Sequence, residues 1–139
     1  VEYVFERRLD AFREAIISLP SGADRREVAI DLLWEQFSSR TFYVWLELLV
    51  AARTDSDLRD TTARVGRSFS GRARDLNAEL FPGLGDTQAG GLLLKITFAL
   101  MNGMAVDRII PDETPVEVIL DFIKMLGPAF RSGTMGSTE

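Results

Sequence analysis

The chain has 139 residues, of which 46% are hydrophobic and 27% charged, and its formal net charge is −5. This composition is typical of one globular domain and excludes collagen-like and wholly disordered chains. Because the sequence contains neither cysteine nor histidine, it also excludes cysteine nucleophiles, Ser-His-Asp triads and His/Cys zinc sites. We expect no bound cofactor or metal. An enzyme built on carboxylates is a distant third hypothesis behind the two below, because no acidic residue lies in the apolar stripes, and we expect none.

The absence of cysteine fits a cytoplasmic protein. No signal peptide is visible, and the longest run without a charged residue, 96–106, is too short to span a bilayer. We therefore expect no membrane contact. The chain opens on Val1 in the middle of a helical pattern, which favours a fragment of a longer protein.

The first half of the chain has the spacing of three amphipathic or buried helices. Apolar residues recur every three or four positions over 1–19, and 20–22 then end this helix. Asp24, with Glu27 three residues later, predicts the start of a second helix that is mostly buried. After a break at Ser38 and Ser39, the apolar segment 42–52 favours a third helix over a strand, because its leucines and alanines are strong helix formers.

The second half predicts three further helices. Thr54 and Asp57 indicate the start of a fourth helix that runs to residue 80, with a bend or local looseness at Gly66 and Gly71. A loop over 81–86 precedes a long apolar helix over 87–110. Thr114, Pro115 and Glu117 then begin a last helix that reaches about residue 126.

Six helices without a convincing strand predict an all-α, bundle-like fold. We expect one domain over 1–131, with 132–139 as a flexible tail.

Several segments resemble the C-terminal domain of TetR-family (tetracycline-repressor-like) transcriptional regulators. They are Leu32-Leu33-Trp34-Glu35-Gln36-Phe37, then 42–48, 51–59 and Met101-Asn102-Gly103-Met104-Ala105. The resemblance, which covers about residues 1–126, implies a domain that binds a small-molecule effector and forms a homodimer. It also implies an N-terminal helix-turn-helix that binds operator DNA, which we expect to be missing from this chain. The first helix would join the two domains.

The last two helices carry more apolar surface than one domain core needs, which favours a symmetric homodimer built as a four-helix bundle. The alternative is a monomer in which the first helix covers this surface. The residues predicted at the dimer interface are Ile96, Leu100, Met104, Val118, Phe122 and Met125.

Aromatic residues are concentrated in the first five helices, where they indicate either an apolar ligand pocket or ordinary core packing. Arg72 could pair with an anionic ligand or with an acidic side chain at the surface, and Asn102 could bind a ligand or a neighbouring helix carbonyl. The residues predicted at the ligand site are Phe5, Leu9, Phe12, Trp34, Phe37, Trp45, Phe69, Arg72, Phe98 and Asn102.

Two functional hypotheses follow. In the first, an apolar or amphipathic effector enters the pocket and shifts the first helix; in the second, the domain is a packed dimerisation module without a ligand. A cavity above about 300 Å³ would favour the first. Arginines at 64, 67, 72 and 74 favour a solvated helix face over a nucleic-acid surface, so we expect no direct DNA binding by this fragment. We also expect Glu47 to lie on an exposed face.

Overall fold

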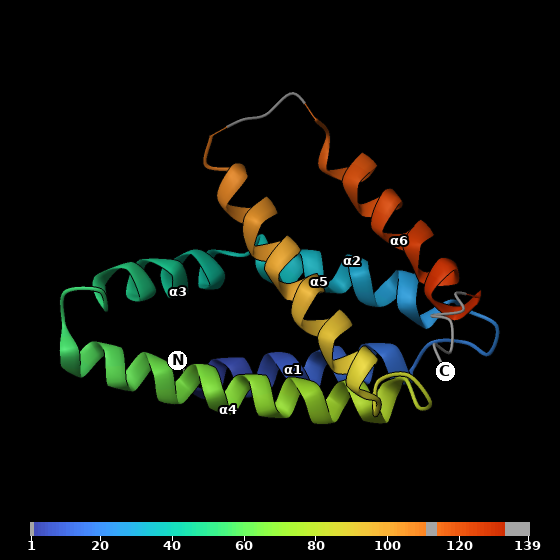
Figure 1. Cartoon of the computed structure of the whole chain (residues 1–139), viewed down its shortest axis with the longest axis horizontal. Helices are drawn as coiled ribbons and strands as arrows, with labels where there is room; N and C mark the ends of the chain where they lie inside the picture. The colour runs from blue at the N-terminus through green and yellow to red at the C-terminus, as the bar shows by residue number, and fades with distance from the viewer. Residues whose placement is uncertain (1, 111–113, 133–139) are drawn as a thin grey trace, which may run out of the picture.

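The computed structural model describes residues 2–110 and 114–132, and this part of the chain contains helices and no strand (Figure 1). The all-α class predicted from the sequence is therefore confirmed. The helices are α1 (Glu2–Ile17), α2 (Arg25–Phe37), α3 (Arg40–Ala51), α4 (Ser56–Leu80), α5 (Gln88–Asp107) and α6 (Val116–Ser132).

The helix starts follow side-chain capping. Asp24 caps α2 as predicted, since its carboxylate accepts from the amides of Arg26 and Glu27. The predicted cap of α4 was one residue too early: the Asp55 carboxylate accepts from the Leu58 amide at 2.9 Å. The Thr54 hydroxyl instead donates to the carbonyl of Ala51, in the preceding helix. An N-cap needs both a side-chain acceptor and an extended backbone, and Asp55 supplies both.

The later helix ends differ from the sequence prediction. α5 ends at Asp107, three residues early, and α6 continues to Ser132. Most of the predicted tail, 133–139, lies outside the described residues. α4 runs without interruption from Ser56 to Leu80 through both of its glycines.

Helices α1 and α4 lie side by side and run in the same direction (Figure 1). Their ion pairs show this register, because residue numbers rise together along both helices. The pairs are Glu2 with Arg64 at 3.8 Å, Glu6 with Arg72 at 2.7 Å, and Arg13 with Glu79. These pairs are exposed, so each adds little to stability, but together they are compatible with only one alignment of the two helices.

The buried apolar residues form two clusters. The first cluster joins α2, α3, α5 and α6 through Phe37, Phe42, Met101, Met104, Ala105 and Leu120. The second cluster joins α1, α2 and α4 through Ile16, Ala29 and Leu80. Because α2 contributes to both clusters, it is the central helix of the fold.

Two glycines set the corner between α4 and α5. A Cβ at Gly85 would overlap the backbone carbonyl of Asn77, and a Cβ at Gly90 would overlap that of Leu84. The backbone segments therefore approach more closely than an alanine would allow. This approach fixes how α5 leaves the loop and crosses the molecule.

Candidate ligand pocket and exposed helical face

A cavity of about 280 Å³ lies among the first five helices, next to both apolar clusters. This volume is just below the ~300 Å³ at which small-molecule sites usually begin, so the size expected for an effector pocket is narrowly missed. Its wall contains Phe37 and Phe42 from the first cluster and Ala29 and Leu80 from the second. The core therefore does not close completely where the two clusters meet.

Eight of the ten residues predicted at the ligand site line this cavity. They are Phe5, Leu9, Phe12, Phe37, Trp45, Phe69, Phe98 and Asn102. Trp34 is not among the lining residues; it packs at the edge of the first cluster, where the guanidinium of Arg108 lies 5.7 Å from its ring centre. On α2 the preceding residue, Leu33, lines the cavity instead.

Arg72 also lies outside the large cavity. Its Nη1 is 2.7 Å from a carboxylate oxygen of Glu6, and its Nη2 is 3.6 Å from one of Asp10. Of the two alternatives for Arg72, the structure shows the surface pairing. The sequence could not decide this, because the pairing depends on how α4 docks against α1.

The aromatic wall is a connected set of rings. The ring of Phe5 lies 5.3 Å from that of Trp45, edge to face, and 5.3 Å from that of Phe69. Phe69 stacks with Phe98 at 5.9 Å, and Phe98 lies 5.5 Å from Phe37. Such ring pairs add stability beyond their buried area. They hold this wall in place without filling the space beside it.

Gly66 of α4 also lines the cavity, and a Cβ added there would meet no atom within 4 Å. The missing side chain leaves room that a larger residue would occupy. The sequence indicated only local looseness at this glycine.

The polar lining residues are Arg8, Gln36, Ser70, Asn77 and Asn102. The amide nitrogen of Asn102 donates to the Phe98 carbonyl of its own helix at 2.9 Å, rather than to a neighbouring helix. Arg8 was missed by the sequence analysis. The sequence does contain a signal for it. Arg8 follows Phe5 by three residues and precedes Phe12 by four, which places it on the apolar face of α1.

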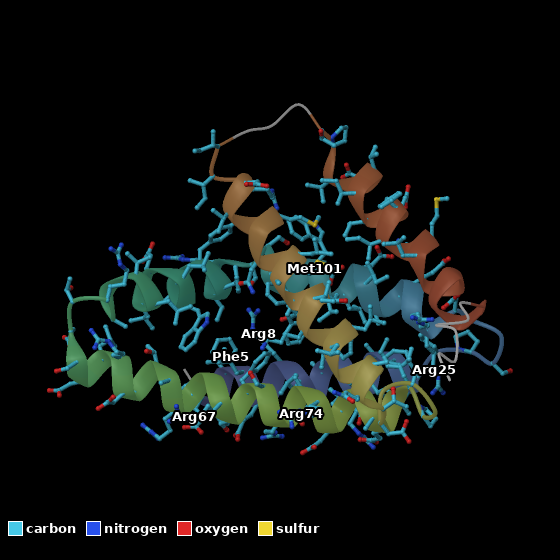
Figure 2. The ribbon with its side chains drawn as sticks, in the orientation of Figure 1. Phe5, Arg8, Arg25, Arg67, Arg74 and Met101 are labelled. Atoms are coloured by element: carbon cyan, nitrogen blue, oxygen red, sulfur yellow. The ribbon has the colours of Figure 1, made fainter. Side chains whose placement is uncertain are left out.

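The side chain of Arg8 crosses from α1 to the junction of α2 and α3. Its Nη1 donates to the side-chain oxygens of Gln36 and Ser39, each at 2.8 Å, and its Nη2 donates to the Thr41 hydroxyl at 2.9 Å. Figure 2 shows Phe5 and Arg8 pointing from α1 into the space between α4 and the helices above it. Arg67 and Arg74 point away, along the outer side of α4. In the described residues, no group of acidic side chains could hold a metal ion.

A second feature is a set of exposed apolar residues on α5 and α6, which we call the α5/α6 face. Its members are Leu92, Ile96, Leu100, Val118, Phe122 and Met125, whose exposed fractions range from 45% for Leu100 to 71% for Met125. Met104, predicted at the dimer interface, is not part of this face. It is 8% exposed and packs in the first cluster, because the turn that carries it faces α2 and α3.

By length and composition, α5 is long and apolar enough to cross a membrane, and it is the one helix in the described part of the chain that meets this test. The charge-free run considered in the sequence was shorter, because Lys95 interrupts the apolar stretch. A single such helix is weak evidence for a span. Only 22% of its apolar window is fully buried, and the rest is divided between partly buried and exposed residues.

The chain shows similarity to bacterial regulators. It is 31% identical over 84 residues to proteins of Mycobacterium bovis and Mycobacterium tuberculosis that are named uncharacterized HTH-type transcriptional regulators. The aligned part is 57% of this chain and 43% of each relative. The chain is thus similar to HTH-type regulators, and these relatives are named as regulators rather than enzymes. It spans less than half the length of the relatives it matches. No family model and no solved structure matches it.

Proposed function

We propose that this chain is the effector-sensing and homodimerisation domain of a TetR-type transcriptional regulator. A small apolar or amphipathic molecule binds in the cavity and controls DNA binding by an N-terminal helix-turn-helix domain. The aligned part is 43% of each regulator relative, which is compatible with a further domain in the full-length protein. The protein works in the cytoplasm, and this fragment itself does not bind DNA.

The observation that carries the proposal is the aromatic-walled cavity of about 280 Å³. The space is partly open to solvent, and its aromatic and aliphatic lining is not packed as densely as a protein interior, which needs an explanation in a small domain. An apolar cavity with a few polar groups is the usual form of a small-molecule site. The alternative of a packed dimerisation module would need a core without such a void.

Dimerisation is proposed from the α5/α6 face. Large apolar side chains spread over two helices are costly to leave in water, at about 25 cal/mol for each Å² of apolar surface. In a dimer with two-fold symmetry, the same exposed residues would be buried in both copies of the chain. The exposed apolar side of α5 is then an interface rather than a membrane span.

Ligand binding can be tested through the two tryptophans, because Trp45 lines the cavity and Trp34 does not. In a Trp34→Phe variant, Trp45 is the remaining tryptophan. A panel of apolar and amphipathic compounds that includes decanol and decanoate should contain members that change Trp45 emission and raise the melting temperature together. Ligand at 100 times its dissociation constant adds about 2.7 kcal/mol of stability.

Two matched glycine variants of α4 separate cavity binding from surface binding. Gly66→Leu places a side chain in the cavity, whereas Gly71 does not line it and has open space around it. Leucine is the better helix former at both positions. Gly66→Leu should abolish the ligand-induced stabilisation, and Gly71→Leu should retain it. If no compound stabilises the wild-type protein, the packed module without a ligand is the correct function.

A further inference from the structure

Arg8 differs from the neighbouring arginines in what it contacts. Arg13, Arg64 and Arg72 all pair with carboxylates across α1 and α4. The three acceptors of Arg8 are an amide and two hydroxyls, all neutral. No aspartate or glutamate is among the described residues that line the cavity. In the described residues, the positive charge of Arg8 therefore lines the cavity and is not bonded to a carboxylate.

The apolar surroundings of Arg8 strengthen the electrostatic interactions of its charge. Arg8 is half-buried, and its cavity is lined mostly by aromatic and aliphatic side chains. A charge in such a setting is screened less than one in water, so an opposite charge beside it is held more strongly. The hydrogen bonds of Arg8 fix its position without neutralising it.

The donor geometry selects the partner. Arginine has five N–H donors, of which three have acceptors in the described residues. Two remain, the number that a carboxylate accepts in a bidentate pair. The side-chain oxygen of Gln36 accepts from Arg8. The NH₂ group of the same amide can therefore donate a further hydrogen bond. One guanidinium and one amide match a single negative charge.

We infer that the cavity takes an amphipathic carboxylate, with an apolar tail against the aromatic wall and a carboxylate held by Arg8 and Gln36. This inference rests on the proposed function, since it names the chemical class of the effector. Binding would also affect α1. The guanidinium of Arg8 that binds the carboxylate also donates to the hydroxyls of Ser39 and Thr41 at the start of α3. Occupancy of the cavity would thus change the tether of the helix that leads towards the DNA-binding domain.

The test compares decanoate, decanol and decylamine, which share a tail and differ in the charge of the head group. Calorimetry on the wild-type protein should show decanoate binding tightest and decylamine weakest. Arg8→Gln should weaken decanoate binding about 10- to 100-fold, the loss expected for a hydrogen-bonded charge pair, and leave decanol binding unchanged. Arg67→Gln removes the same charge from the outer side of α4 (Figure 2) and should leave all three affinities unchanged.

A second readout does not depend on the variant folding. In the wild-type protein, the Nε–H resonance of Arg8 should shift on addition of decanoate and not on addition of decanol. If decanol binds as tightly as decanoate, or if Arg8→Gln binds decanoate normally, the inference is wrong and the apolar pocket of the proposed function remains. If none of the three compounds binds and no member of the wider panel does, the proposed function fails as well.

Discussion

The hydroxyl of Tyr43 in α3 donates to the backbone carbonyl of Ala105 in α5 at 2.9 Å. In a continuing helix this carbonyl would accept from the amide of Ile109, but that amide bonds to Val106 instead as α5 ends. Ala105 is completely buried, so water cannot replace the missing donor. The tyrosine therefore completes the last turn of α5 and joins it to α3.

Removing this hydroxyl should destabilise the fold. Tyr43→Phe leaves the Ala105 carbonyl buried without this donor, and we expect the free energy of unfolding to fall by about 1–3 kcal/mol. Chemical denaturation followed by circular dichroism measures the change. Tyr3→Phe is the control, since Tyr3 is 67% exposed; equal stability of the two variants would show that the bond to Ala105 contributes nothing.

The corner between α4 and α5 predicts opposite effects at adjacent glycines. Gly90→Ala places a Cβ against the carbonyl of Leu84 and should cost at least about 1–3 kcal/mol, because backbone must move. Gly91→Ala meets nothing within 4 Å and should raise stability by about 0.5–1 kcal/mol through helix propensity. Thermal melts of both variants test this, and a stable Gly90→Ala protein would contradict the close approach.

Lys124 predicts an alkaline loss of stability. Its Nζ lies 2.7 Å from a carboxylate oxygen of Asp31, and this hydrogen bond to Asp31 raises the Lys124 pKa above its ordinary value of 10.5. A raised folded-state pKa gives stabilisation that is complete below 10.5 and is lost as the pH rises through the folded-state value. Lys124→Met should therefore lower the melting temperature at neutral pH, and the gap to wild type should narrow above pH 10.5.

The other lysine of the chain, Lys95, is exposed and supplies the control. Lys95→Met should leave the melting temperature near that of wild type across the same pH range. A gap between wild type and Lys124→Met that persists unchanged at high pH would show that packing of the side chain, rather than its charge, holds α6 against α2.

The α5/α6 face predicts a dimer that one charge disrupts. Phe122 is 61% exposed in the single chain, and burying an aromatic residue at an interface commonly contributes about 2 kcal/mol or more. Light scattering coupled to gel filtration should give twice the chain mass of 15.5 kDa for wild type. Phe122→Arg should give the chain mass or aggregate, because the two-fold axis would bury two unpaired charges.

The control adds a positive charge elsewhere. Glu47 lies on the exposed side of α3, as expected from the sequence, and Glu47→Arg should remain dimeric. If the wild-type protein is a monomer at micromolar concentration, the α5/α6 face is not a dimer interface.

Much of the fold could be predicted from the sequence, because helices are specified by local sequence patterns. Apolar spacing and capping residues gave the six helices, and the same spacing selected most of the residues that line the cavity. How the helices pack against one another could not be predicted from the sequence. Arg8 and Arg72 both lie beside apolar stripes, and only the side-by-side packing of α1 and α4 turns Arg72 towards Glu6 while Arg8 faces the cavity.

Met104 shows the same limit within one helix. Leu100 is one turn earlier on α5 and is 45% exposed, whereas Met104 is 8% exposed. Both are apolar, and their spacing places them on the same side of an isolated helix. Which turn is covered depends on where α2 and α3 cross beneath α5. That crossing is a property of the whole chain rather than of the local pattern.

The position of the cavity between two apolar clusters has a consequence for cooperativity. When the space is empty, the cluster around Met101 and the cluster around Ile16 are separate packing units that share α2. Regions of a protein with fewer shared contacts open independently at lower free energy than global unfolding. An occupant that touches both clusters would make them unfold as one unit. Amide hydrogen exchange should then slow in α1 and α5 together, including at residues that the occupant does not touch.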